Sequence, residues 1–188
     1  RDCSKEIKNV ISDFKNQGQF KGLIIDLRNN PGGLLNESVD IVNLFVDKGE
    51  EIVSTKGKIK SWDKKYIARN EPLDKQIPLV VLINSASASA SEIVSGVIQD
   101  YDRGVLVGQR TYGKGLVQQT RPLAYNSQLK VTTGKYYIPS GRCIQAIDYS
   151  HRNPDGSVGK IPDSLKNKFK TSGGRVVYDG GGVNPDIE

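Results

Sequence analysis

The first repeated pattern of apolar residues in this chain has the period of a helix. Between Ser4 and Asn16, apolar side chains recur at the spacing i, i+3, i+4, i+7, at Ile7, Val10, Ile11 and Phe14. Ser4 is a suitable N-cap because its hydroxyl can accept a hydrogen bond from a free backbone N–H, and Gly18 is a suitable end. The pattern predicts an amphipathic helix over residues 4–16.

Three short apolar runs follow, and each predicts a buried strand. They cover residues 22–27, 78–84 and 104–108. Helical spacing resumes after the first two runs, over residues 36–45 and 92–99, and a loop separates each run from its helix. Strands that alternate with helices in this way predict an α/β domain.

Longer extended segments complete the pattern. Residues 51–55 predict a short strand, and residues 116–123 and 129–138 predict a β-hairpin that turns near Asn126 and Ser127. A turn is expected at residues 139–142. The tail beyond it is rich in glycine, asparagine and proline, and its pattern predicts no further element.

Composition narrows the class of protein. The chain has 188 residues, of which 36% are hydrophobic and 26% are charged, values that indicate one globular domain with a substantial core. No apolar run approaches the ~20 residues that a membrane span needs, and no signal-peptide pattern opens the chain. The sequence contains no methionine, so we expect it to be a processed or excised piece of a longer protein.

The net charge of +6 raises the question of a nucleic-acid partner. Lysines are densest between residues 56 and 65, and Trp62 and Tyr66 lie among them, which could make a basic stripe with stacking aromatic rings. The other interpretation is an exposed hairpin or loop with two partly buried rings. No nucleic-acid-binding motif accompanies the segment, so we favour the hairpin and predict no nucleic-acid partner.

The two cysteines, Cys3 and Cys143, argue against a metal centre. The chain has no Cys-x-x-Cys motif and no cluster of cysteine and histidine, so neither a zinc site nor a cofactor is expected. A disulfide would be possible in an oxidising compartment. Two buried free thiols are the favoured interpretation.

A tract of alternating serine and alanine over residues 85–91 offers the first candidate chemistry. It joins a predicted strand to the start of a predicted helix, where free backbone N–H groups and the helix dipole stabilise negative charge. One of its serines could therefore be a nucleophile. The alternative is an N-cap serine in a tightly packed turn, and periodicity does not choose among the four hydroxyls.

A hydroxyl nucleophile needs a base, and the single histidine is a poor candidate. His151 lies in a polar stretch rich in turn-forming residues, and no Gly-x-Ser-x-Gly motif is present, which argues against a Ser-His-Asp triad. Lys114, between two glycines, can replace histidine if burial keeps its amine neutral. In an extended chain, Gln118 lies on the same face and can orient that amine. The alternative is an exposed lysine in a turn.

The loop over residues 30–33, Asn-Pro-Gly-Gly, offers hydrogen-bond donors for a developing negative charge. It also follows a predicted strand and precedes a predicted helix, so we expect it at the same edge as the serine tract. Its paired glycines let a backbone N–H approach a ligand closely, as an oxyanion hole requires. A simple type II turn is the alternative.

A phosphate-binding P-loop is a rival interpretation of residues 108–114, which have its glycine and lysine spacing after a strand. Gly115 stands where a magnesium-binding serine or threonine is required. The following residues, 116–123, predict a strand where a P-loop requires a helix. Both departures argue against this interpretation.

Several motifs in order resemble the carboxyl-terminal processing peptidases, the serine-lysine proteases of family S41. The matching segments are Gly-Leu-Ile-Ile-Asp-Leu-Arg-Asn-Asn-Pro-Gly-Gly at 22–33, Ser-Ala-Ser-Ala-Ser-Glu-Ile at 87–93, Thr-Tyr-Gly-Lys-Gly-Leu-Val-Gln at 111–118, Tyr-Tyr-Ile-Pro-Ser-Gly-Arg at 136–142 and Gly-Gly-Val-Asn-Pro-Asp at 181–186. The resemblance covers residues 20–188. It implies an α/β fold with a ClpP/crotonase-like ββα spiral core, and residues 1–188 as the protease core without the PDZ domain that usually precedes it.

The resemblance also implies roles for individual residues. The nucleophile falls on Ser89, the general base on Lys114, and the residue that orients the lysine on Gln118. The backbone donors of the oxyanion hole fall on Ala90 and on Gly32 or Gly33, between which the motif does not choose.

The function that these roles imply is a serine endopeptidase that cleaves protein substrates near their C-termini. The expected partners are proteins or peptides, bound through their C-terminal tails; no membrane contact is evident in the chain, and an oligomer is possible. The parent protein is expected to be periplasmic or otherwise exported. Two alternatives remain: an inactive protease fold that binds peptides, and a crotonase-like acyl enzyme.

Overall fold

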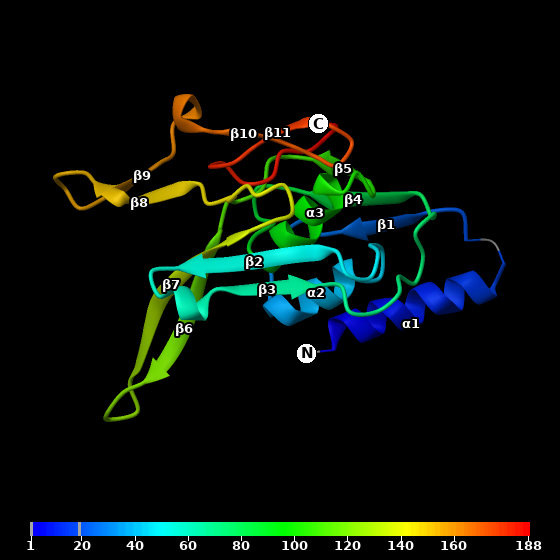
Figure 1. Cartoon of the computed structure of the whole chain (residues 1–188), viewed down its shortest axis with the longest axis horizontal. Coiled ribbons are helices and arrows are strands. Elements are labelled where there is room, and N and C mark those ends of the chain that lie inside the picture. The colour runs from blue at the N-terminus through cyan, green and yellow to red at the C-terminus, as the bar shows by residue number, and fades with distance from the viewer. Residues whose placement is uncertain (1, 19) are drawn as a thin grey trace.

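Three parallel strands form the sheet on which the rest of the chain is arranged (Figure 1). The computed structural model describes residues 2–18 and 20–188. The parallel strands are β1 (Leu23–Asp26), β4 (Leu79–Ile83) and β5 (Val105–Gly108), in the order β1-β4-β5. Each of the three predicted apolar runs is therefore a strand, and all three lie in one sheet.

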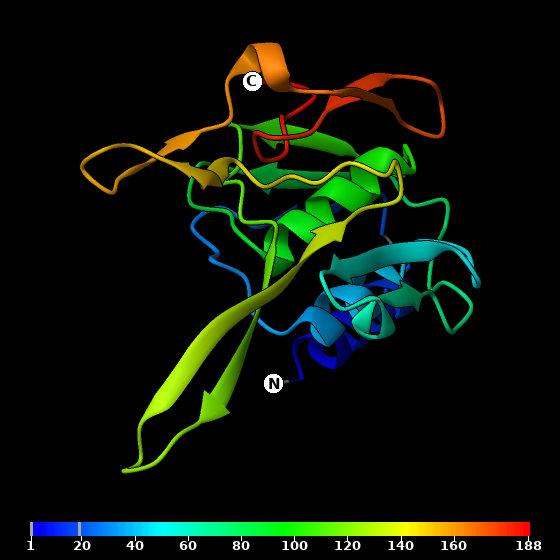
Figure 2. The same ribbon diagram turned by 60° about the vertical axis from the view of Figure 1, so that its left-hand side comes forward.

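Three helices accompany this sheet. They are α1 (Cys3–Asn16), α2 (Leu35–Val42) and α3 (Ala90–Asp100). Every residue of α3 is buried, because the helix contacts β5 on one side and β2 and α2 on others. Figure 2 shows α3 running through the centre of the molecule between the two larger sheets. Its apolar side chains form much of the core.

A second sheet is antiparallel, with the order β3-β2-β7-β6. Its strands are β2 (Glu51–Gly57), β3 (Lys64–Ile67), β6 (Leu116–Pro122) and β7 (Gln128–Tyr137), and a short 3₁₀ turn, η1 (Lys60–Trp62), joins β2 to β3. The predicted hairpin is confirmed as β6 and β7, and its tip projects from the molecule (Figure 2). The lysine-rich segment is the β2–β3 hairpin. The fold is thus a mixed α/β arrangement.

The tail contains elements that the sequence pattern does not predict. They are β8 (Ile147–Arg152), β9 (Val158–Lys160), a 3₁₀ turn η2 (Asp163–Leu165), β10 (Lys168–Lys170) and β11 (Val176–Tyr178). Four of these form two short hairpins, β8–β9 and β10–β11. The end of the chain returns to the parallel sheet, where the Gly108 N–H donates to the Ile187 carbonyl at 2.9 Å.

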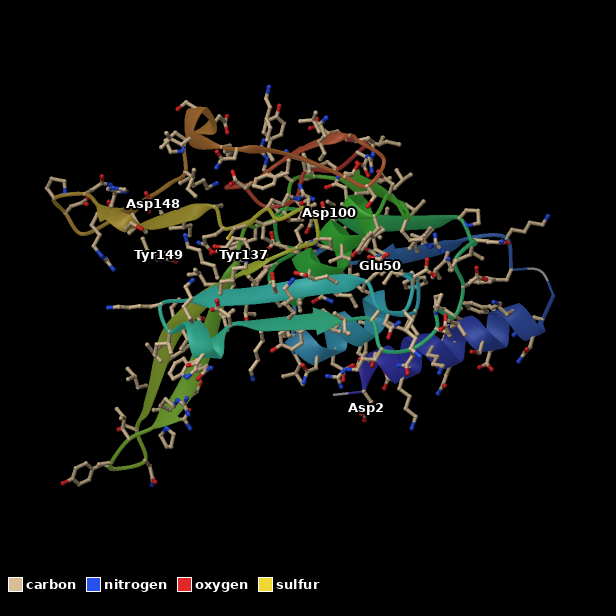
Figure 3. The ribbon with its side chains drawn as sticks, viewed as in Figure 1. Asp2, Glu50, Asp100, Tyr137, Asp148 and Tyr149 are labelled. Atoms are coloured by element: carbon tan, nitrogen blue, oxygen red, sulfur yellow. The ribbon has the colours of Figure 1, made fainter. Side chains whose placement is uncertain are left out.

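An ion pair lies inside the core beside α3. Arg142 Nη2 is 2.9 Å from Asp100 Oδ1, and both side chains are buried. Asp100 Oδ2 also accepts the Ser140 N–H, and Arg142 Nη2 donates to Gln99 Oε1. Figure 3 shows Asp100 in the interior, whereas Asp148 and Tyr149 lie on the peripheral strand β8. Burial raises the pKa of Asp100 and lowers that of Arg142.

Two elements differ in their ends from the prediction. The helix expected over residues 36–45 ends at Val42, because residues 43–45 turn away to lead the chain toward β2. Ser4 is not the N-cap of α1, which begins one residue earlier and has Asp2 at that position. The Ser4 N–H instead donates to Glu37 Oε2 on α2, so the first turn of α1 is attached to its neighbour.

Two expectations about burial and one about a turn were also wrong. Ile24 in β1 is 66% exposed, because β1 is an edge strand and only its Leu23 and Ile25 face packs against the core. Cys3 is an exposed free thiol, while Cys143 is partly buried and burial raises its pKa. His151 lies in strand β8 and not in a turn, with its ring exposed and Nδ1 2.7 Å from Asp148 Oδ2.

Candidate active site

The loops that follow the three parallel strands meet at one edge of the sheet. Carboxyl ends of parallel strands lie together, and this is the edge where α/β sheets bind ligands. The Ala88 N–H donates to the Asn30 carbonyl at 3.0 Å, and the Tyr112 N–H donates to the Ser87 carbonyl at 3.0 Å. The Pro-Gly-Gly loop, the serine tract and the loop before Lys114 are therefore adjacent, as the shared edge predicts for the first two.

The structure distinguishes the serines of the tract by their surroundings. Ser87 is fully buried, and its hydroxyl donates to the Leu27 carbonyl at 2.7 Å and accepts the Asn84 N–H at 3.0 Å. Ser91 is also buried, whereas Ser85 is exposed. Ser89 is only partly buried and directly precedes α3. Its position at the end of a strand-to-helix turn leaves it accessible from the loops.

The backbone of Ser89 is strained. Its φ of 57° and ψ of −116° lie in a region that residues other than glycine rarely adopt. Such strain persists only where the surroundings enforce it, and it accumulates at functional sites. A sharp strand-to-helix turn of this kind presents a nucleophilic serine in the α/β-hydrolases. The conformation sets Ser89 apart from the other serines of the tract.

The carboxylate of Glu92 joins the serine loop to the lysine loop. Its Oε2 accepts the N–H groups of Ser89 at 2.8 Å and Lys114 at 2.9 Å. Its Oε1 accepts the Thr111 hydroxyl at 2.5 Å and the Gly113 N–H at 2.7 Å. The side chain is completely buried, and this burial raises the pKa of Glu92 while the four hydrogen bonds oppose the rise.

The hydroxyl of Tyr136 connects the same two residues from the carbonyl side. It lies within hydrogen-bond distance of the Ser89 carbonyl, at 3.2 Å, and of the Lys114 carbonyl. Burial raises the pKa of Tyr136 well above its ordinary value, so the phenol keeps its proton as a donor. Glu92 and Tyr136 together fix the backbone of Ser89 relative to that of Lys114.

The side chains of Lys114 and Gln118 are less constrained than these backbones. Lys114 is partly buried and lies just before β6, while Gln118 is exposed on β6. Among the described residues, no hydrogen bond joins Lys114 Nζ to Ser89 Oγ or to Gln118. The structure thus brings the Lys114 backbone to the serine loop, and the contact of its amine with the hydroxyl stays a prediction.

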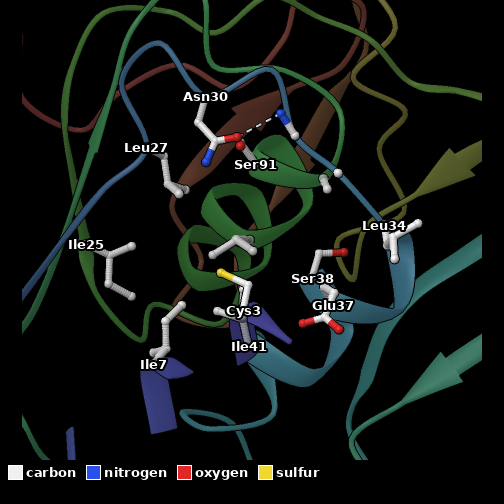
Figure 4. Close-up of a pocket in the computed structure, with 14 residues that line it drawn as sticks. Cys3, Ile7, Ile25, Leu27, Asn30, Leu34, Glu37, Ser38, Ile41 and Ser91 are labelled. Carbon is white, nitrogen blue, oxygen red and sulfur yellow. Dashed lines mark hydrogen bonds between the residues drawn. The ribbon is translucent and has the colours of Figure 1, made fainter. Parts of the chain in front are cut away.

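The Pro-Gly-Gly loop packs closely against Ser89. Gly32 has φ +89°, and a Cβ there would lie 2.5 Å from the Ala88 oxygen and 2.7 Å from the Ala90 nitrogen, so glycine is required. The Gly32 N–H donates to Asn30 Oδ1 at 2.9 Å (Figure 4). The N–H groups of Gly33 and Ala90 have no hydrogen-bond partner within residues 2–18 and 20–188. Both donors are therefore open to an acceptor from outside these residues, and an oxyanion role for them stays a prediction.

A cavity of about 300 Å³ opens beside these donors (Figure 4). Gly33, Ala90 and Ser91 are among the residues that line it. Its walls are mainly apolar and come from β1, α1, α2 and α3; they include Ile7, Ile25, Leu27, Leu34, Ile41 and Val94. The Cys3 thiol lies in the middle of this group (Figure 4). The cavity can hold an apolar side chain next to Ser89.

Sequence reasoning missed Glu92, Thr111 and Tyr136. Glu92 could have been found, because Ser89-x-x-Glu92 has the spacing of a capping box in which the glutamate reaches back to the N-cap N–H. The structure forms that bond. Thr111 and Tyr136 act through long-range contacts, with the hydroxyl of Tyr136 reaching Ser89 from another sheet, and no local pattern reveals such contacts.

One rival interpretation of the motifs, the P-loop, does not agree with the structure. A P-loop over residues 108–114 would have to be followed by a helix, but residues 116–122 form strand β6.

Within the described part of the chain, no group of three or more His, Cys, Asp or Glu side chains could hold a metal ion. In the same residues, no helix has both the length and the apolar character needed to cross a membrane.

Comparison with known proteins places this chain in a family. The chain is 43% identical over 173 residues to a carboxy-terminal-processing protease of Bartonella bacilliformis, covering 92% of this chain and 39% of that protein. A probable CtpA-like serine protease of Staphylococcus epidermidis is 42% identical over 169 residues, which cover 86% of this chain and 34% of the relative. This chain therefore spans between a third and two fifths of the length of these relatives.

Solved structures agree with these sequence relatives. The chain is similar to a photosystem II D1 C-terminal processing protease, with a TM-score of 0.67 and 34% identity over 76% of this chain and 36% of that one. A putative S41 protease from Bacteroides fragilis shares the fold at 17% identity, with a TM-score of 0.63 over 73% of this chain and 38% of that one. The family model described as Peptidase family S41 matches residues 2–155. This chain therefore belongs to peptidase family S41.

Proposed function

We propose that this chain is the catalytic core of a serine endopeptidase that uses a Ser89–Lys114 dyad to cleave protein substrates near their C-termini. The observation that carries the proposal is the strained, accessible Ser89 beside two free N–H donors. Its backbone is fixed to that of Lys114 through Glu92 and Tyr136. The ClpP/crotonase-like spiral, substrate capture through C-terminal tails, an oligomer and an exported location belong to the same proposal.

The proposed reaction begins with the attack of Ser89 Oγ on the carbonyl carbon of the scissile peptide bond. Lys114 Nζ, in its neutral form, takes the hydroxyl proton, and Gln118 orients that amine. The oxyanion that forms accepts the N–H groups of Gly33 and Ala90. Lys114 then gives the proton to the leaving amine, and the acyl group remains on Ser89. Water, deprotonated by Lys114, releases the acyl group and restores the serine hydroxyl.

The cavity beside Gly33 and Ala90 suits the substrate side chain that precedes the cleaved bond. Its walls are mainly apolar, and its volume of about 300 Å³ leaves room for an apolar side chain of any size. We infer that an apolar side chain is preferred at this position. Gly32 serves the site differently, since its N–H is already bound by Asn30 and its missing side chain lets the loop approach Ser89.

Cleavage of an unstructured polypeptide by matched variants tests this function. Ser89→Ala and Lys114→Ala should each abolish cleavage, because one removes the nucleophile and the other the base. Ser85→Ala is the control, since Ser85 is an exposed serine of the same tract. Cleavage that survives Ser89→Ala, or that is lost in Ser85→Ala, contradicts the proposal. If the protein binds peptides but does not cleave them, it is the inactive, peptide-binding protease fold of the alternative interpretation.

A further inference from the structure

A second groove, of about 520 Å³, lies between α2 and the antiparallel sheet. Two cationic side chains and two aromatic ones characterise its walls: Lys64, Arg121, Trp62 and Tyr66. We call it the basic–aromatic groove. One end is formed by Leu34, Leu35 and Asn36, which directly follow Gly33 of the candidate active site. An extended chain bound at Ser89 can therefore continue into this groove.

The charge of the groove is not balanced by nearby acids. No aspartate or glutamate lines it in the described part of the chain. Two neighbouring lysines are paired outside it, Lys65 with Glu51 at 2.9 Å and Lys60 with Asp63 at 3.9 Å. Lys64 and Arg121, the two cations of the groove itself, form no salt bridge within residues 2–18 and 20–188. They are available to a negatively charged ligand.

The aromatic side chains give the groove apolar surface next to this charge. Trp62 is 49% exposed, and Tyr66 is partly buried against the core. The side chain of Lys56 lies on the other face of the sheet, where its Nζ is 4.9 Å from the centre of the Tyr137 ring in a cation–π contact. Exposed rings beside cations suit a ligand that carries both apolar groups and carboxylates.

We propose that the basic–aromatic groove binds an acidic segment of the polypeptide substrate, on one side of the bond cleaved at Ser89. This inference rests on the proposed function and adds a charge preference to it. Carboxylates of the segment pair with Lys64 and Arg121, and its apolar side chains contact Trp62. A nucleic acid is the less suitable occupant, because the cations gather in one short groove beside the candidate active site and do not form a long stripe.

Trp62 provides the measurement, because it is the single tryptophan of the chain. Its fluorescence is titrated in the Ser89→Ala protein with an extended peptide that contains three glutamates, and with the same peptide carrying glutamines. We expect a change of Trp62 emission and about tenfold tighter binding of the glutamate peptide at low salt. The difference should shrink at high salt, since charge pairing is screened.

Variants locate the binding. The double variant Lys64→Gln/Arg121→Gln should bind the glutamate peptide about tenfold more weakly and leave binding of the glutamine peptide unchanged. Lys168→Gln, on β10 outside the groove, is the matched control and should bind as the parent does. In the protein with Ser89 intact, the double variant should raise KM for an acidic substrate and leave kcat unchanged.

Three results would overturn the inference: no response of Trp62, equal affinity for the two peptides, or tighter binding of a single-stranded oligonucleotide than of the glutamate peptide. The binding titration uses a protein without the nucleophile, so it succeeds or fails independently of catalysis. If peptide binding follows charge but cleavage does not depend on Ser89, the groove stands and the proposed function falls. If cleavage depends on Ser89 but peptide binding does not follow charge, the proposed function stands and the proposed role of the groove falls.

Discussion

At the scale of single residues, the site depends on backbone groups held in place by buried polar side chains. Ser89 takes a strained conformation, and Glu92 accepts its N–H while Tyr136 contacts its carbonyl. The same two side chains hold both backbone groups of Lys114. The relative position of nucleophile and base is thus set by contacts that do not involve their own reactive atoms.

The two glycines of the Pro-Gly-Gly loop should differ in their tolerance of alanine. Gly32→Ala places a methyl group 2.5 Å from the Ala88 oxygen at a positive φ, which displaces the loop. We expect a loss of about 1–3 kcal/mol in the free energy of unfolding and roughly 100-fold lower kcat/KM. Gly33→Ala is the control, because space is open there and the N–H is kept. Urea unfolding measures the stability of the two variants, and peptide cleavage measures their kcat/KM. Equal losses in Gly32→Ala and Gly33→Ala would contradict the different roles given to the two glycines.

Replacing Glu92 by glutamine should separate its role in the site from a simple loss of charge. The amide NH₂ would face N–H donors that the carboxylate now accepts. We expect the free energy of unfolding to fall by about 2–4 kcal/mol, and cleavage to fall much more than binding of an uncleaved peptide. Aspartate at this position keeps the charge but is too short to bridge Ser89 and Lys114. A variant with normal kcat would contradict the role.

The raised pKa of Glu92 gives this position a dependence on pH. The folded protein takes up this proton at a higher pH than the unfolded chain, so the contribution of Glu92 to folding is greatest at low pH and is lost as pH rises through its folded pKa. The pH dependence of activity has the opposite sign, because Glu92 can accept all four hydrogen bonds only as an ionised carboxylate. We expect kcat/KM to fall on acidification with a midpoint above the ordinary value of 4.5, and this limb to be absent in the residual activity of Glu92→Gln.

At the scale of elements, helix α3 is the part on which the site is built. Its first turn carries Ala90 and Glu92, and its last residue, Asp100, is fixed to the turn after β7 by Arg142 and the Ser140 N–H. The sequence pattern predicts this helix and the strands around it well, because each has a clear period or a continuous apolar run. The short hairpins of the tail have neither, and long-range contacts determine them.

The buried ion pair should be costly to break from one side only. Asp100→Ala leaves the Arg142 guanidinium buried without its acid, and we expect a loss of about 3–5 kcal/mol in the free energy of unfolding. Replacing both residues by leucine should cost less than the sum of the single changes. Lys15→Ala breaks the surface pair with Asp74, at 2.9 Å, and should cost less than about 1 kcal/mol. Equal costs for the buried and surface pairs in urea unfolding would contradict this account.

At the scale of the whole molecule, the end of the chain fastens the sheet that carries the site. Asp186 accepts the Leu106 N–H and the Gln99 amide, each at 2.8 Å, and pairs with Arg175 at 2.5 Å. Motif order along the sequence predicts the partners of the site, since Ser89, Lys114 and the glycines follow three strands of one sheet. It could not predict the Tyr136 contact or this anchoring, because they join segments far apart in the chain.

Removing the contacts of Asp186 should lower the free energy of unfolding, although Asp186 lies far from the candidate active site along the chain. Asp186→Ala leaves the Gln99 amide and the Leu106 N–H without their acceptor, and we expect a loss of about 2–4 kcal/mol. The exposed Glu188 is the control, and Glu188→Ala should change stability by less than about 0.5 kcal/mol. Thermal unfolding of the two variants measures the difference. An unchanged midpoint in Asp186→Ala would show that the tail does not fasten the sheet.

The central claim is that Ser89 is a nucleophile activated by Lys114, and covalent labelling tests it most directly. The protein is incubated with a peptidyl fluorophosphonate, which reacts with activated serines, and the modified residue is identified by mass spectrometry. We predict a single adduct on Ser89, with none on Ser85, Ser87 or Ser91, and loss of the adduct in Lys114→Ala while the fold is retained. An adduct on another serine, or undiminished labelling of Ser89 in Lys114→Ala, would contradict the account.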